Sequence, residues 1–135
     1  MLLVTAALLF CDNRVLLTKR REDAPYPGYW EFPGGKVEAD EDPMRCVERE
    51  LGEELGITVR ATGIYDVLFH RYPERTVLVL VYRCEWLAGD ILDLQVAAHR
   101  WVEPGALGTY RLLPADVPLA ERLVREFDDA DTAGL

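Results

Sequence analysis

The sequence predicts an α/β sandwich, in which helices cover a mixed β-sheet. Two observations support this fold class. Apolar, β-prone runs occur at 2–10 and 76–86, as expected of buried strands. Apolar residues at helical spacing occur at 43–55 and 117–127, one in the middle of the chain and one near its end.

The first part of the chain predicts a hairpin followed by a loop. The apolar run 2–10 should form a strand, and 15–20 should return as a second one after a turn at 11–14, where Asp and Asn favour turns. Two prolines and a glycine make 24–29 an irregular loop. Residues 30–32 are expected to form a short strand.

Clear signals bound the central helix. Asp42 can cap its start, Pro43 suits the first helical position, and Gly56 suits the residue just past the end. Four apolar residues fall on one side of this helix and should point into a core: Met44, Val47, Leu51 and Leu55.

The rest of the chain should alternate strands and turns before a last helix. We expect one or two strands over 58–71, interrupted near Gly63, then a turn at 72–75 and the strand 76–86, which ends at 88–90. The later elements are expected to be a short strand at 99–102, a helical turn and loop at 104–110, a core-packed helix at 117–127 and a frayed tail over 129–135.

Length, charge and cysteine content limit the class of protein. With 135 residues, half of them hydrophobic, the chain 1–135 is expected to form a single domain. Its formal net charge of −9 argues against nucleic-acid polymers and anionic membranes as partners. The apolar start lacks a basic leader and is too short to span a membrane. The three cysteines form no zinc or disulfide pattern, so we expect reduced thiols in a cytoplasmic protein. The protein is expected to be a monomer or a homodimer.

Three glutamates gather on one face of the central helix. Glu53 and Glu54 follow Glu50 by three and four residues. Like charges at such spacings destabilise a helix by on the order of a few tenths of a kcal/mol per pair. The face is either simply solvated, or it binds a hard divalent cation that removes the repulsion and is shared with substrate phosphates. Arg49 lies beside Glu53 and can clamp a carboxylate through two parallel hydrogen bonds.

The loop before the helix extends this pattern. It reads Gly35, five residues, Glu41, seven residues, then Arg49-Glu50-Leu51-x-Glu53-Glu54-x-Gly56-Ile57, which fixes nine positions over 23 residues. At every one of these positions the chain resembles a Nudix hydrolase. The preceding segment 30–38 is similar to the MutT-type branch, which hydrolyses nucleoside triphosphates. The resemblance implies a Nudix-type α/β/α sandwich around a mixed sheet.

The resemblance also implies the chemistry. Water would attack within the triphosphate of a nucleotide and release a nucleoside monophosphate and pyrophosphate, with Mg²⁺ or Mn²⁺ as cofactor. Glu41 would support the loop. The implied metal ligands are the Gly34 carbonyl, Glu50, Glu53 and Glu54, and the implied catalytic residues are Glu50, Glu53 and Arg49.

Several residues outside the helix are candidates to contact the substrate. Arg20 and Arg75 occupy places of substrate-contacting arginines in MutT-like enzymes, but each could equally be an exposed strand-end charge. Lys36 could touch phosphate or be solvated. Phe32 and Tyr29 could stack on a base or belong to the core.

One position departs from the family pattern. Many MutT-like enzymes carry a further glutamate six residues before the tryptophan that corresponds to Trp101, and here that position is Gln95. Glutamine cannot act as a general base, although its carbonyl can still touch a metal or water. Either Glu50 or Glu53 then takes the base role, or the protein is slow. A local register error is the other reading, because Asp93 and Glu103 lie nearby.

The segment 112–119 bears on the choice of substrate. It resembles the base-contacting segment of the MutT branch, in the form seen in cytidine-nucleotide pyrophosphohydrolases. An ionised Asp116 would accept hydrogen bonds from the amino group of cytosine or from the N7–H of oxidised guanine; alternatively, it caps the last helix. The expected function is therefore a Mg²⁺-dependent pyrophosphohydrolase acting on 8-oxo-dGTP or on (d)CTP and modified dCTP. An ADP-ribose pyrophosphatase and a non-catalytic nucleotide-sensing module are the alternatives.

Overall fold

Strand β1 (Leu2–Cys11) lies in the middle of a seven-stranded mixed sheet. The computed structural model describes residues 1–133, with side chains through Phe127. The strand order is β3-β2-β1-β6-β5, with β4 paired to β1 and β7 paired to β2. β1 runs parallel to β6, and the other pairs are antiparallel. The remaining strands are β2 (Arg14–Lys19), β3 (Trp30–Glu31), β4 (Gly34–Lys36), β5 (Thr58–Arg71), β6 (Thr76–Ala88) and β7 (Ala98–Val102).

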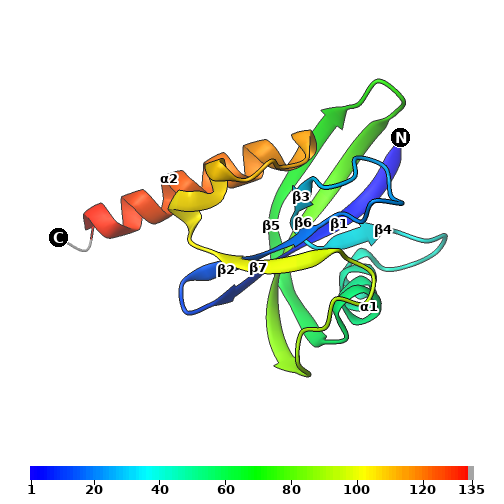
Figure 1. Ribbon diagram of the computed structural model, residues 1–135, viewed down its shortest axis with the longest axis horizontal. Helices are drawn as coiled ribbons and strands as arrows, with labels where there is room; N and C mark the ends of the chain where they lie inside the picture. Colours follow the sequence, from blue (N-terminus) through cyan, green and yellow to red (C-terminus); the bar gives the residue numbers. More distant parts are fainter. Residues whose placement is uncertain (134–135) are drawn as a thin grey trace.

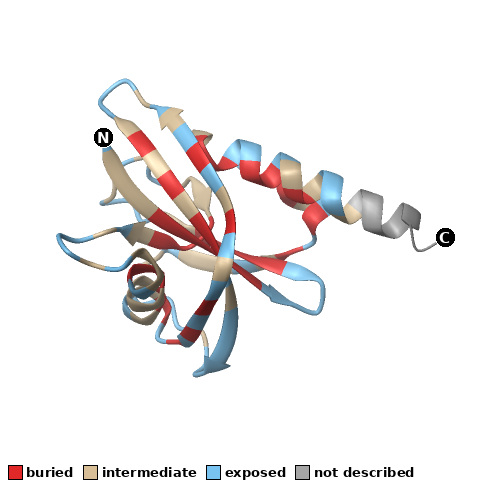
Figure 2. Ribbon diagram, turned by 180° about the vertical axis from the view of Figure 1, so that it is seen from behind, coloured by how far each residue is buried: buried red, intermediate tan, exposed pale blue. Residues whose placement is uncertain are grey.

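Two α-helices, α1 (Pro43–Leu55) and α2 (Val117–Ala133), cover opposite faces of the sheet (Figure 1). Successive residues of a strand point to opposite faces, so Ala6 and Leu8 of β1 pack in the core with α2, whereas Ala7 and Leu9 pack in the core with α1. Buried residues therefore form bands along the strands between the helices (Figure 2). The predicted α/β/α sandwich around a mixed sheet is confirmed.

The caps predicted for α1 are present. The Asp42 carboxylate accepts the Met44 N–H at 2.8 Å, and Gly56 adopts a left-handed φ of 69° while its N–H bonds the Gly52 carbonyl. Val47, Leu51 and Leu55 are fully buried, and Met44 packs at the edge of the same core. The apolar side of α1 is therefore fixed to the sheet, which leaves the glutamate face free to form one wall of a cleft.

The structure differs from the sequence-based expectation at three places. Residues 34–36, expected within a loop, form β4, because Gly34 allows close pairing with β1: a Cβ there would lie 2.0 Å from the Thr5 carbonyl oxygen. Residues 58–71 form one strand, with register shifts on either side of Gly63 rather than a break. The last helix is longer than the expected 117–127, because α2 continues to Ala133 and so includes part of the segment 129–135 expected as a tail; 134 and 135 lie outside the described residues.

Two 3₁₀ helices connect β7 to α2. The first, η1 (Pro104–Thr109), matches the expected helical turn, and the second, η2 (Pro114–Asp116), leads directly into α2. In the part of the chain that the structure describes, no helix has both the length and the apolar composition needed to cross a bilayer.

Candidate active site

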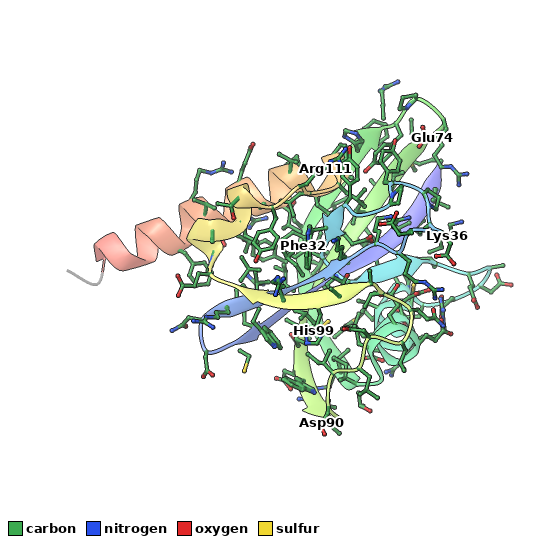
Figure 3. All side chains as sticks on the ribbon, in the orientation of Figure 1. Phe32, Lys36, Glu74, Asp90, His99 and Arg111 are labelled. Carbon is green, nitrogen blue, oxygen red and sulfur yellow. The ribbon has the colours of Figure 1, made fainter. Side chains whose placement is uncertain are left out.

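A cleft of about 740 Å³ opens between α1, the edge of β1 and β4, the loop after β2, the β5–β6 turn and η2. Phe32, Lys36 and Glu74 line different parts of it and are labelled in Figure 3. The cleft is within the usual size of small-molecule sites. Except for Tyr29, it is lined by the residues that the sequence indicated for metal, catalysis or substrate: Arg20, Phe32, Gly34, Lys36, Arg49, Glu50, Glu53, Glu54, Arg75 and Asp116.

Arg49 organises the acidic wall of the cleft. Its Nε and Nη2 donate to the two carboxylate oxygens of Glu41 at 2.8 and 3.0 Å, so the bidentate partner is Glu41 rather than Glu53. Its Nη1 donates to Glu50 at 2.9 Å and to Glu53 at 3.1 Å. The Arg49 hydrogen bond holds the pKa of Glu41 near 2, well below its ordinary value. A fifth hydrogen bond, from Arg49 Nη2 to the Lys36 carbonyl at 3.2 Å, links the loop before α1 to the helix.

The carboxyl group of Glu50 lies against Gly35 of strand β4. A Cβ on Gly35 would lie 2.3 Å from the Glu50 Cδ, so only glycine leaves room for this carboxylate. The Gly35 carbonyl in turn accepts the Thr5 hydroxyl at 3.3 Å. Burial raises the pKa of Glu50 above its ordinary value, although Arg49 lowers it.

Glu54 is the most strongly perturbed acid on this wall. Burial, together with repulsion from Glu31 and Glu50, raises its pKa to about 9. A divalent cation would reverse this, because positive charge favours the ionised carboxylate. The oxygen donors gathered here are those that Mg²⁺ prefers, so the residues fit such a cation.

The acids of this wall lie close together: Arg49 Nη1 binds both Glu50 and Glu53, and the Glu54 carboxyl group forms a side-chain hydrogen bond with Glu50. Among the described residues, no group of three His, Cys, Asp or Glu side chains already surrounds a common metal position.

Glu31, to which the sequence analysis assigned no role, belongs to the cleft. Its carboxylate accepts Arg20 Nη1 at 2.8 Å, and both side chains are mostly buried. Burial nevertheless raises the pKa of Glu31. The available signal was the opposite charge of Arg20 and Glu31 near the ends of two adjacent strands, since β2 and β3 pair Thr18 with Glu31.

Asp116 is buried at the opposite end of the cleft, 5% exposed. Its carboxylate accepts the backbone N–H of Phe32 at 3.2 Å, a tertiary contact in place of the helix cap that was the alternative reading. Burial, with repulsion from Glu31, raises its pKa to about 8. This shift favours the protonated form of Asp116 in the protein without ligand, whereas the sequence led us to expect an ionised carboxylate.

The other candidates divide between cleft and core. Lys36 and Arg75 are exposed residues that line the cleft. Phe32 also lines it, but only 2% of the residue is exposed and it packs in the core next to α2. Tyr29 lies outside the cleft lining and stacks under Arg111, with 4.0 Å between the guanidinium carbon and the ring centre.

The structure also shows which residue stands at the place of the further glutamate of the family pattern. Gln95 lines the cleft, and its N–H donates to the Glu54 carbonyl at 3.1 Å. Asp93 instead pairs with His99 at 2.6 Å, and Glu103 lies 3.7 Å from Arg14, both outside the cleft lining. The register alternative is therefore wrong, because neither acid replaces the glutamine in the cleft.

Comparisons with known proteins agree with this geometry. Residues 1–127 match the NUDIX domain family. An 8-oxo-dGTP diphosphatase of Haemophilus influenzae is 34% identical over 115 residues, 84% of each chain, and a CTP pyrophosphohydrolase of Escherichia coli is 37% identical over 125 residues, 90% of each chain. The crystal structure of the MutT protein from Methanosarcina mazei has a TM-score of 0.82 at 29% identity, covering 93% of this chain and 94% of that one. The chain therefore belongs to the NUDIX family and is a Nudix hydrolase of the MutT-like type.

Proposed function

We propose that this protein is a Mg²⁺-dependent pyrophosphohydrolase that cleaves a nucleoside triphosphate to a nucleoside monophosphate and pyrophosphate. The observation that carries the proposal is one cleft with two different ends. Glu50, Glu53 and Glu54 form a crowded acidic wall, and a buried, hydrogen-bonding Asp116 lies at the other end. A polyphosphate and a base attached to one sugar need these two environments at once.

The acidic wall is the proposed metal and catalytic site. Glu50, Glu53 and Glu54, with the backbone carbonyl of Gly34, would hold Mg²⁺ or Mn²⁺. When bound, such a cation neutralises phosphoryl oxygens and lowers the pKa of a bound water. Arg49 keeps Glu50 and Glu53 in place through its hydrogen bonds, which limits the reorganisation needed when substrate enters.

A carboxylate must accept the proton of the attacking water. Gln95 lines the cleft at the place where the family pattern carries a further glutamate, and an amide cannot accept that proton at neutral pH. We assign the role to Glu50 or Glu53, which share the guanidinium group of Arg49.

Cationic side chains at the cleft are proposed to bind the phosphate chain. Arg75 and Lys36 are both exposed and both line the cleft. Arg20 is available only in part, because it is paired with Glu31. These three charges would offset the repulsion between a polyanionic substrate and a protein with net charge −9.

Asp116 is the proposed base-reading residue. A neutral carboxylic acid offers one O–H donor and one acceptor oxygen. Cytosine presents an N3 acceptor beside its amino donor, and 8-oxoguanine presents an O6 acceptor beside an N7–H donor, so either base matches it. The chemistry of this residue supports (d)CTP, modified dCTP and 8-oxo-dGTP as substrates, consistent with the named activities of the two relatives.

A substrate panel tests the proposal. Purified protein with Mg²⁺ is incubated with 8-oxo-dGTP, dCTP, 5-methyl-dCTP, the ordinary dNTPs and ADP-ribose, and pyrophosphate and monophosphate are measured. We expect pyrophosphate release from at least one modified or cytidine nucleotide, and a loss of about 10²-fold or more in Glu53→Gln. Glu48→Gln is the matched control: it lies on the same helix, outside the cleft lining, and its amide carbonyl can still accept the Ala61 N–H.

The panel also separates the other candidate functions. Turnover of ADP-ribose alone would point to the pyrophosphatase alternative, and tight nucleotide binding without any turnover would point to a non-catalytic module. Unchanged activity in Glu53→Gln would remove that residue from the mechanism. A cytoplasmic location and a monomeric or homodimeric state remain part of this proposal, the former supported by three free cysteine thiols.

A further inference from the structure

Tyr72 links the β5–β6 turn to the segment that carries Asp116. It is half-buried, lines the cleft and lies at the start of the turn, where its N–H donates to the Arg75 carbonyl at 2.8 Å. Its hydroxyl oxygen accepts the backbone N–H of Ala115 at 3.1 Å, across 43 residues of sequence. Ala115 is the residue immediately before Asp116.

This hydrogen bond acts as the cap of η2. The first N–H groups of a helix have no partner within it and are normally satisfied by a side chain at the N-cap. Leu113 occupies that position in η2 and has no polar side-chain atom, so no side-chain cap bond forms there. Ala115 is only 5% exposed, and an unpaired N–H at this buried place would be costly. The Tyr72 hydroxyl therefore fixes the peptide just before Asp116.

The ring of Tyr72 is itself held on two sides. The His70 ring lies edge-on with 4.5 Å between ring centres, and the Tyr26 ring lies 5.3 Å away at a tilt. Tyr26 is anchored in turn, because its hydroxyl donates to the Glu74 carboxylate at 3.1 Å. These contacts restrict the Tyr72 hydroxyl to the direction of Ala115.

We propose that Tyr72 is a positioning residue for base recognition: its hydroxyl, bonded to the Ala115 amide, sets the place of the Asp116 carboxyl in the cleft. The inference deepens the proposed function and rests on it for the identity of the ligand, a nucleobase. Tyr72 acts through Asp116, so its effect on base preference should disappear when Asp116 can no longer read the base.

Binding of nucleoside monophosphates without metal tests this, because it needs no turnover. Calorimetric titration with dCMP, 8-oxo-dGMP, dTMP and dAMP gives a base preference, the ratio of the weakest to the tightest Kd. Tyr72→Phe keeps the ring and removes the hydroxyl, and should lower the preference about five- to ten-fold. In an Asp116→Asn background the same change should alter the preference less than two-fold. Tyr65→Phe is the matched control: it also loses a hydroxyl that forms a side-chain hydrogen bond, but one with Glu126 outside the cleft lining, so the preference should stay that of the wild type.

Each outcome of the binding experiment either supports or overturns the positioning role of Tyr72. A non-additive cycle with an unaffected Tyr65→Phe supports the positioning role. Equal weakening for all four monophosphates, or additive effects of the two substitutions, overturns it, because a merely structural tyrosine would give that pattern. A wild type without base preference also overturns it. Failure of the proposed function is seen separately, as absence of pyrophosphate release from the substrate panel while base preference in binding persists.

Discussion

Replacing Asp116 by asparagine should change how the stability of the protein depends on pH. The native pKa of this carboxyl is raised from 3.8 to about 8 by burial and by Glu31. The native state therefore binds the proton more tightly than the unfolded chain does. Between the two pKa values the native state carries more protons, so the free energy of unfolding falls as pH rises, and the fall ends above about pH 8.

The size of the effect follows from the same values. The pKa of Asp116 is 3.8 in the unfolded chain and about 8 in the native state. This difference lowers the free energy of unfolding by at most about 3–4 kcal/mol between pH 5 and pH 8. Water that enters the cleft reduces the effect, so we expect the free energy of unfolding to fall by about 1–3 kcal/mol over this pH range. Asparagine has nearly the same shape, keeps an acceptor for the Phe32 N–H and does not titrate.

Urea unfolding at pH 5, 6, 7 and 8 measures the difference. The free energy of unfolding of Asp116→Asn minus that of the wild type should rise by about 1–3 kcal/mol over this range. Asp90→Asn, at an exposed position, is the control, and its curve should run parallel to that of the wild type. A difference for Asp116→Asn that is flat within about 0.5 kcal/mol, or that falls with pH, would refute the conclusion that burial keeps this acid protonated.

Two further substitutions test the wall of the cleft and its support. Gly35→Ala should lower kcat about 10²-fold with little change in Tm, because the added Cβ, 2.3 Å from Glu50 Cδ, displaces a flexible carboxylate rather than backbone. Gly108→Ala is the control, because a Cβ there meets nothing within 4 Å, and its kcat should match that of the wild type. Equal kcat values in the two variants would contradict the position of Glu50 against Gly35. Leu51→Ala, at a fully buried position on the apolar side of α1, should lower the free energy of unfolding in urea by about 2–5 kcal/mol, and a loss under about 1 kcal/mol would mean that α1 is not anchored through this residue.

Local patterns in the sequence were enough to predict α1 and the acids on it. Asp42 and Gly56 are capping residues whose effect depends only on their near neighbours, and both caps are present. The spacing of Glu50 and Glu53 along one helix puts them on one face whatever the rest of the chain does. For this reason the acidic wall, with Arg49 beside it, could be recognised before any tertiary contact was known.

Only the tertiary structure decided what lies opposite that wall. The strand β4 depends on β1 approaching Gly34, 29 residues away in sequence, and the Tyr72 hydroxyl meets the Ala115 amide across 43 residues. Repulsion from Glu31 helps to raise the pKa of Asp116, although the two residues are far apart along the chain. Burial and long-range proximity are properties of the packed chain, so the protonation of Asp116 and its support by Tyr72 could not be inferred from residue type and spacing.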